Sequence, residues 1–178
     1  ITMTEAAEKG THKVITEHST VGIVVTTDGT ICDIPREKYE APEERAITEL
    51  KSIGKPFVVL LNSAEPASET AIAIAEEITA RYDVRCIRVN CMTLTEDDIA
   101  GIIRSVLEEF PLKSIGIFLP EWLEALPEDN ELRNELFASI MDCSSSVCRI
   151  KDCRCAVDKL LQCECVNDVS IDRSDLGT

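Results

Sequence analysis

The sequence is poor in basic residues. It carries 18 Lys and Arg against 33 Asp and Glu, a formal net charge of −15 over 178 residues. Sequence-independent binding to nucleic acid needs a basic face that neutralises phosphates, and adsorption to anionic lipid needs a basic cluster. The charge balance therefore argues against nucleic acid as a partner and against direct adsorption to a membrane surface.

Long apolar stretches are missing too. The sequence has no run of 18 or more apolar residues, and its opening, ITMTEAAEKG, lacks the basic-then-apolar order of a secretory signal peptide. We therefore expect a cytosolic protein. The sequence has nine cysteines, and without a secretory signal a disulfide framework is not expected. The three scattered ones, Cys32, Cys86 and Cys91, are expected to be free and mostly buried thiols.

A phosphate-binding loop is absent from the sequence pattern. Nucleotide hydrolases commonly supply backbone amides and a lysine in the order G-x4-G-K-[ST]. The only Gly-Lys pair followed by an apolar strand pattern is Gly54-Lys55, which precedes Pro56 and has no Gly five residues earlier. We interpret this pair as the end of a helix, and we predict no catalytic residue in this chain.

Strand and helix patterns alternate through the first two thirds of the sequence. Apolar runs predict strands within residues 20–30, 55–63, 84–90 and 112–120, and amphipathic periods predict helices at 4–19, 41–54, 67–83 and 95–110. Helices between apolar strands are typical of a parallel α/β sheet covered on both faces, which binds ligands at the carboxyl ends of its strands. Beyond residue 120 the pattern is helical, and residues 153–178 are compatible with a helix that gives way to a strand.

Several residues are typical of helix ends. Pro42 is predicted in the first turn of one helix and Gly54 at its end. Thr4 and Ser68 are candidate N-caps. Thr95, with Asp98 three residues later, is close to a capping box.

Polar residues follow two of the predicted strands. In GTPase-like folds one strand ends in Asn-Lys-x-Asp, whose Asp pairs with guanine, and the next strand is followed by Ser-Ala-Lys. The corresponding residues here are Asn62-Ser63-Ala64-Glu65 and Asn90-Cys91-Met92, in the right order and at the right spacing, although both motifs are degenerate. They predict the base side of a nucleotide pocket, with Asn62, Ser63, Glu65, Asn90 and Cys91 as binding residues. Asn90 either contacts the base or caps its own loop.

Other polar residues carry weaker signals. Asp28 and Asp33 share a loop and could touch a partner or an ion, but a role in the turn is favoured. His12 and His18 have no acidic or hydroxyl partner at a useful spacing and are predicted to be surface or packing residues.

Three stretches carry a family resemblance: EAAEKGTHKVITEHSTVGIVVTTDGTICDI, EERAITELKSIGKPFVVLLNS and VLEEFPLKSIGIFLPEWLEAL. They resemble the stage IV sporulation protein A family, the spore-coat morphogenetic ATPases of endospore-forming bacteria, which are related to translation-factor GTPases. The resemblance covers nearly the whole chain, and HSTVGIVVTTDGTI is its most distinctive part. It implies a partial P-loop GTPase-like, Rossmann-like α/β fold. Residues 1–120 would be the C-terminal half of the ATPase domain, and residues 121–178 a helical connection and the start of an α+β middle domain.

The resemblance also implies a function. The intact protein would use ATP and Mg²⁺ and would polymerise as the basement layer of the spore coat, whereas this fragment would bind neither by itself. It would lie in the mother-cell cytoplasm at the outer forespore membrane, held there by a small anchoring protein and contacting other spore-coat proteins. The fragment itself is expected to form a dimer through its first strand, which would lie at an open sheet edge.

The cysteine-rich tail supports a competing interpretation. Six cysteines lie between residues 143 and 165, including the pairs Cys153/Cys155 and Cys163/Cys165. They could make the chain a non-enzymatic interaction module that binds zinc. Structural zinc sites, however, typically use C-x2–4-C spacing, and on a strand a C-x-C pair serves equally well as small apolar core residues. We therefore predict no metal ligand.

Overall fold

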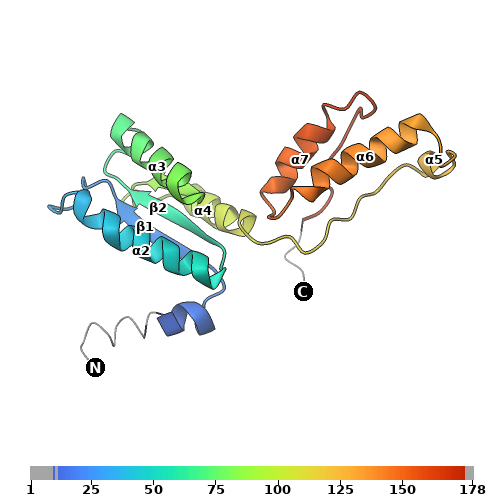
Figure 1. Ribbon diagram of the computed structural model, residues 1–178. Helices are drawn as coiled ribbons and strands as arrows, with labels where there is room; N and C mark the ends of the chain where they lie inside the picture. Colours follow the sequence, from blue (N-terminus) through green and yellow to red (C-terminus); the bar gives the residue numbers. More distant parts are fainter. Residues whose placement is uncertain (1–9, 11, 175–178) are drawn as a thin grey trace. The chain divides into compact units, whose positions relative to one another are not determined.

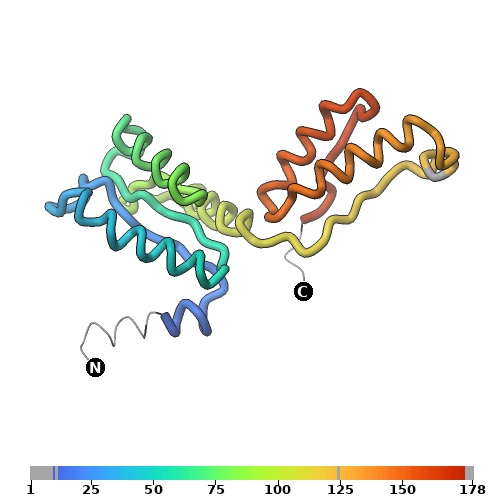
Figure 2. Tube along the Cα trace, viewed as in Figure 1, coloured from blue at the N-terminus to red at the C-terminus, as the bar shows by residue number. Residues whose placement is uncertain are grey.

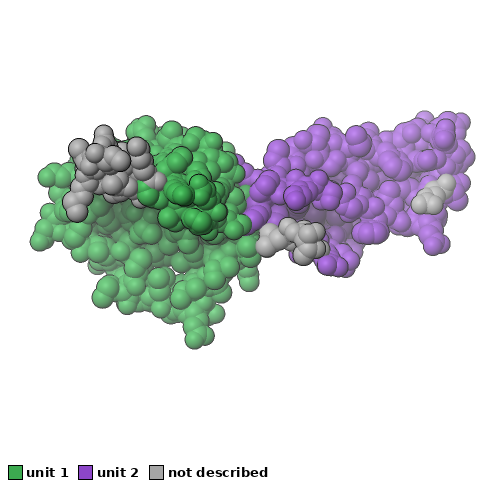
Figure 3. Space-filling view, turned by 90° about the horizontal axis from the view of Figure 1, so that it is seen from below, with its two compact units in different colours: residues 1–109 green, residues 110–178 purple. Residues whose placement is uncertain are grey.

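The computed structural model describes residue 10 and residues 12–174 (Figure 1). The chain divides into two compact units, residues 1–109 and residues 110–178, which Figure 3 colours separately. Unit 1 contains η1 (Val14–His18), β1 (Gly22–Thr27), α2 (Glu37–Ile53), β2 (Phe57–Asn62), α3 (Glu69–Tyr82), β3 (Cys86–Val89) and α4 (Glu96–Glu108). Unit 2 contains α5 (Glu121–Glu124), α6 (Glu131–Ser145) and α7 (Asp152–Leu160).

The strands of unit 1 form one parallel sheet in the order β1-β2-β3. In the register of the sheet, Val24 lies opposite Val59 and Leu60 opposite Ile87. Each strand is joined to the next by one helix, as a parallel sheet requires, because the chain must return to the starting edge before the next strand begins. The predicted α/β fold with a parallel sheet and flanking helices is confirmed.

The fourth predicted strand, within residues 112–120, is wrong. Residues 112–120 have no regular secondary structure and follow a short antiparallel bridge between Pro111 and Arg149 (yellow in Figure 2). The Leu112 amide donates to the Cys148 carbonyl at 2.8 Å. An apolar run becomes a strand only where a neighbouring strand supplies hydrogen-bond partners. Residues 112–120 belong to unit 2, and no strand pairs with them among the described residues.

Helix ends are set by local chemistry, mostly as predicted. The Ser68 hydroxyl accepts from the Ala71 amide, and Thr95 forms a complete capping box with Asp98. Gly54 ends α2 in the left-handed conformation, at φ 72°. Pro42, however, lies inside α2 and not in its first turn, because the helix begins at Glu37; the preceding turn, Lys38 N to Pro35 O at 3.1 Å, extends the helix upstream. The cap predicted at Thr4 lies outside the described residues.

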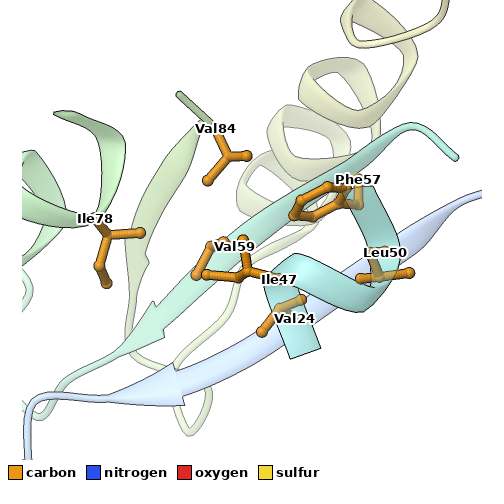
Figure 4. Packing of buried hydrophobic residues seen from close by; sticks show 7 residues of the cluster. All are labelled: Val24, Ile47, Leu50, Phe57, Val59, Ile78 and Val84. Atoms are coloured by element: carbon orange, nitrogen blue, oxygen red, sulfur yellow. The ribbon is translucent and has the colours of Figure 1, made fainter. Parts of the chain in front are cut away.

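Two apolar layers cover the sheet. On one face Val24 and Val59 pack with Ile47 and Leu50 of α2 and Ile78 of α3 (Figure 4). On the other face, Ile102 and Val106 of α4 pack on Val58, Leu60 and Val89. Strand β2 is therefore buried from both sides, which explains its continuous apolar sequence.

The α4 face is incompletely covered. Ile23 and Val25 of β1 lie in register beside Val58 and Leu60, yet they are 47% and 61% exposed. Helix α4 thus covers β2 and β3 and leaves this face of β1 exposed to solvent.

In the described part of the chain, no helix combines the length and the apolar content needed to cross a bilayer.

Candidate functional site

Three loops meet at the carboxyl edge of the sheet. Because β1, β2 and β3 are parallel, the segments that follow them lie at the same edge. We call these segments loop 1 (residues 28–35), loop 2 (residues 62–68) and loop 3 (residues 90–94). All five residues predicted to bind the nucleotide base belong to loops 2 and 3.

Loops 2 and 3 are joined by two side-chain amides. The Cys91 backbone amide donates to Asn62 Oδ1 at 2.9 Å, and Asn90 Nδ2 donates to the Ala64 carbonyl at 3.1 Å. Asn90 Oδ1 also accepts from the Met92 amide at 3.0 Å. The structure therefore brings Asn62, Asn90 and Cys91 together, and Asn90 contacts both loop 2 and its own loop.

Ser63 and Glu65 occupy different environments. Ser63 is fully buried; its amide donates to the Val89 carbonyl at 2.9 Å and its hydroxyl accepts from the Glu65 amide at 3.0 Å. Glu65 is exposed at the loop surface. Ser63 thus stabilises the loop from inside the fold, whereas the Glu65 side chain faces solvent.

Loop 1 also reaches loop 2, through Thr30, a residue that no sequence pattern singled out. The Thr30 amide and hydroxyl both donate to Asp28 Oδ1, at 3.0 and 2.6 Å, and the Thr30 oxygen accepts from the Ala64 amide at 2.9 Å. The predicted turn role of Asp28 is confirmed. The Asp-Gly-Thr order gave a signal for the turn, but nothing local showed that Thr30 would bind the chain 34 residues later.

Asp28 lies below the surface of this edge. It is 8% exposed, and its Oδ2 has no hydrogen-bond partner among the described residues. Burial acts to raise the pKa of Asp28, but the nearby hydroxyls of Ser63 and Thr30 and the Thr30 amide outweigh it and hold the pKa below its ordinary value. The carboxyl edge of the sheet therefore contains a buried negative charge directly after β1.

A buried ion pair braces the end of β1. Arg36 donates to both carboxylate oxygens of Glu43, at 2.6 and 2.9 Å, and its Nη1 also donates to Thr26 Oγ1 at 3.0 Å and to the Thr27 carbonyl at 3.3 Å. The planar guanidinium suits this two-sided contact. The pair fixes the start of α2 to the strand end that carries loop 1.

Lys55, the lysine of the Gly-Lys pair, has a structural partner. Its ammonium group donates to the carbonyls of Ile15, Thr16 and Ser19 at the end of η1. Together with the left-handed Gly54, this confirms that the pair ends a helix. His12 and His18 are exposed, which confirms their predicted surface location. The expected lack of an acidic partner is wrong, because His12 Nδ1 lies 2.9 Å from Glu49 Oε1 and His18 Nε2 lies 4.0 Å from Glu17 Oε2.

The tail cysteines do not have the strand geometry considered for them. Cys153 and Cys155 lie in helix α7, where residues two apart point about 200° apart around the axis. No strand follows α7 within residues 161–174. Within the described residues, no three His, Cys, Asp or Glu side chains are grouped so that they could hold a metal ion.

Comparison with known families assigns both units. Residues 1–111 match the family description "Stage IV sporulation protein A, ATPase domain", and residues 112–178 match "Stage IV sporulation protein A, middle domain". The chain belongs to the stage IV sporulation protein A family. The resemblance inferred from the sequence is confirmed, and the three loops lie in the part that matches the family's ATPase domain.

Individual members of the stage IV sporulation protein A family align over most of the chain. The protein of that name from Clostridioides difficile (strain 630) is 37% identical over 99% of this chain and 36% of its own length. Those from Bacillus subtilis (strain 168) and Bacillus anthracis are 40% and 38% identical over 83% of this chain and 30% of their own lengths. The chain thus spans about a third of these relatives. No solved structure matches it.

Proposed function

We propose that residues 1–111 form the base side of an ATP pocket in a sporulation protein that hydrolyses ATP. The observation that carries this proposal is the hydrogen-bonded edge formed by loops 1, 2 and 3, within the stretch that matches an ATPase domain. Ligands of parallel α/β sheets bind at this edge. Asn62 braces loop 3, and Asn90, Cys91 and Glu65 line the base.

The phosphate side of the pocket is proposed to come from outside these 178 residues. The sequence has no G-x4-G-K-[ST] pattern, and Lys55 is bound to backbone carbonyls. Phosphoryl transfer depends on groups that position the phosphates and on Mg²⁺, which stabilises the developing charge. Hydrolysis would drive polymerisation into the basement layer of the spore coat.

The expected nucleotide preference follows from position 65. An Asp there would pair with guanine through two hydrogen bonds, but Glu65 places its carboxylate one methylene further from the backbone. The same paired geometry is then lost, so we propose that the pocket accepts ATP at least as well as GTP.

A titration tests this role in a longer polypeptide of the family that includes the phosphate-binding segment. Asn62→Ala removes the acceptor of the Cys91 amide and should weaken ATP binding by about fivefold or more, the value of one hydrogen bond. Glu76→Ala, on the exposed side of α3, is the matched control and should bind like the unmodified protein. Strong GTP preference that disappears in Glu65→Ala would refute the proposal, because Glu65 would then recognise guanine.

The 178-residue chain by itself provides a second test. It should hydrolyse neither ATP nor GTP above a blank, because the groups that position the phosphates are not in its sequence. Turnover that Asn62→Ala abolishes would show that the chain contains a complete site.

Self-association through β1 is part of the proposal. The Gly22 amide donates to the Pro56 carbonyl at 3.0 Å, so by strand alternation the amides of Ile23, Val25 and Thr27 point away from β2. β1 is the end strand of the described sheet, and it carries neither Pro nor Lys to oppose pairing. We propose that two copies pair edge to edge in a two-fold dimer.

Sedimentation tests the dimer. Val25→Pro removes one outward amide and should shift the chain to monomer, while the ladder between β1 and β2 remains intact. Val25→Thr keeps the amide and the branched side chain and should remain dimeric. Circular dichroism checks that both variants fold. A monomeric unmodified chain at high concentration would contradict edge pairing.

The cellular setting of the proposal follows the family. The protein would act in the mother-cell cytoplasm at the outer forespore membrane, bound there through a small anchoring protein and in contact with other spore-coat proteins. Imaging of a fluorescent fusion of the whole protein in sporulating cells tests this location.

A further inference from the structure

The backbone of Ala64 is held by hydrogen bonds from both neighbouring loops. Its amide donates to Thr30 Oγ1 at 2.9 Å, and its carbonyl accepts from Asn90 Nδ2 at 3.1 Å. Ala64 lies at the centre of loop 2, between Asn62 and Glu65. Loops 1 and 3 therefore both bind Ala64, which separates the Asn62 and Glu65 side chains along loop 2.

The contact from loop 1 depends on a charged partner. A threonine hydroxyl has one proton, and Asp28 Oδ1 accepts it at 2.6 Å. With its proton engaged, the Thr30 oxygen presents a lone pair to the Ala64 amide. Asp28 thus determines that Thr30 acts as an acceptor toward loop 2, and hydrogen bonds to a charged group are the stronger kind.

The backbone of loop 1 is shaped for this contact. Gly29 has φ +91°, a backbone conformation that residues with a side chain rarely adopt, and its amide donates to Thr27 Oγ1 at 3.1 Å. This turn brings the Thr30 amide and hydroxyl back onto the Asp28 carboxylate. The turn and the buried carboxylate together fix the place of the Thr30 oxygen.

We propose that Asp28 and Thr30 are positioning residues that set the conformation of loop 2 for recognition of the nucleotide base. The proposal rests on the base-side function proposed above. Neither residue needs to touch the nucleotide. Their effect passes through the backbone of Ala64 to Asn62 and Glu65, and through the Asn90 side chain to loop 3.

Amide hydrogen exchange of the 178-residue chain, followed by NMR, tests the positioning itself. Thr30→Val replaces the hydroxyl with a methyl group and should speed exchange of the Ala64 amide on the order of fivefold, the value of one hydrogen bond. The Ser63 amide, bonded to the Val89 carbonyl, is the internal control and should keep its rate. Thr30→Ser retains the hydroxyl and should restore the slow exchange at Ala64.

Two outcomes of the exchange experiment would contradict the positioning role. An unchanged Ala64 rate in Thr30→Val, or equal acceleration at Ala64 and Ser63, overturns the positioning role. Thr30→Ala provides the same test if Thr30→Val does not fold.

The longer polypeptide tests the functional consequence. There Thr30→Val should raise the KM for ATP several-fold with little change in kcat, and Thr30→Ser should return it to normal. If Ala64 exchange accelerates while KM stays unchanged, Asp28 and Thr30 still position the loop, and the proposed base-side role of loop 2 is what fails.

Discussion

Replacing Arg36 with methionine should destabilise unit 1 strongly. The Glu43 side chain is 4% exposed and the Arg36 side chain 16% exposed, so the pair is shielded from water. Arg36→Met keeps an apolar stem but removes the guanidinium, which makes two bonds to Glu43 and two to the end of β1. The Glu43 carboxylate would then be buried without its partner.

The size of the effect follows from that burial. Removing one partner of a buried pair typically costs about 3–5 kcal/mol, mostly because the remaining charge is desolvated. Some water reaches Arg36, so we expect the lower end, about 3 kcal/mol. Burial acts to lower the pKa of Arg36, but its hydrogen bonds with Glu43 and the charges of Glu43, Glu40 and Glu77 raise it, so the guanidinium stays charged.

Native-state hydrogen exchange measures this loss. The Val59 amide, in the central strand and bonded to the Arg85 carbonyl at 2.9 Å, should exchange roughly 100-fold faster in Arg36→Met. Arg81→Met is the matched control, because the pair of Arg81 and Glu44 is about half exposed and should contribute at most about 1 kcal/mol.

A double substitution gives the decisive comparison. Arg36→Met combined with Glu43→Met removes both charges and should recover at least about 2 kcal/mol relative to Arg36→Met alone. A loss below about 1 kcal/mol in the single variant, or no recovery in the double variant, would refute the reasoning, because Glu43 would not depend on Arg36 for its charge.

Three further predictions concern the cysteines and the capping box. Burial, with a smaller effect from the charge of Glu43, raises the pKa of Cys86 to about 12. Iodoacetamide at pH 8, with the products followed by mass spectrometry, should therefore modify the exposed Cys91 well before Cys86. The reverse order would show that β3 unfolds locally and exposes Cys86. Hydrogen bonds from Thr95 lower the pKa of Asp98 below its ordinary value of 3.8. The contribution of Asp98 to stability is therefore present above pH 3.8 and is lost as the pH falls through the lower pKa of the folded state. Asp98→Asn should flatten the acid-unfolding curve in this pH range, and an unaltered curve would contradict the prediction. Dialysis against a chelator should leave the thermal midpoint unchanged, since a structural zinc would contribute on the order of 10 kcal/mol; stoichiometric zinc and collapse on chelation would favour the zinc-binding interpretation.

Local patterns were sufficient for much of unit 1. Apolar runs predicted β1, β2 and β3, and Ser68, Thr95 and Gly54 set helix ends through contacts within a few residues. The strand-helix alternation predicted a parallel sheet, because crossover helices are needed to return the chain. Asn62 ends β2 and Asn90 directly follows β3, and these positions in the chain are enough to place both residues at one edge of the sheet.

Tertiary contacts decided the secondary structure where they conflicted with the local sequence pattern. Residues 112–120 have a strand-like sequence but no strand beside them among the described residues, so they remain irregular. Pro42 stays within α2 because the helix begins upstream, next to the Arg36 contact with β1.

The sequence by itself determined the family, through the resemblance of three stretches. It also determined the parallel sheet and the edge where its loops meet, since these depend on periodicity and chain order. Only the tertiary structure decided which side chains meet there. Thr30 and Ala64 are 34 residues apart, and Asn62 and Cys91 are 29 apart. Such contacts depend on the register of neighbouring strands and on the turn at Gly29, and no local pattern specifies the distance between two loops.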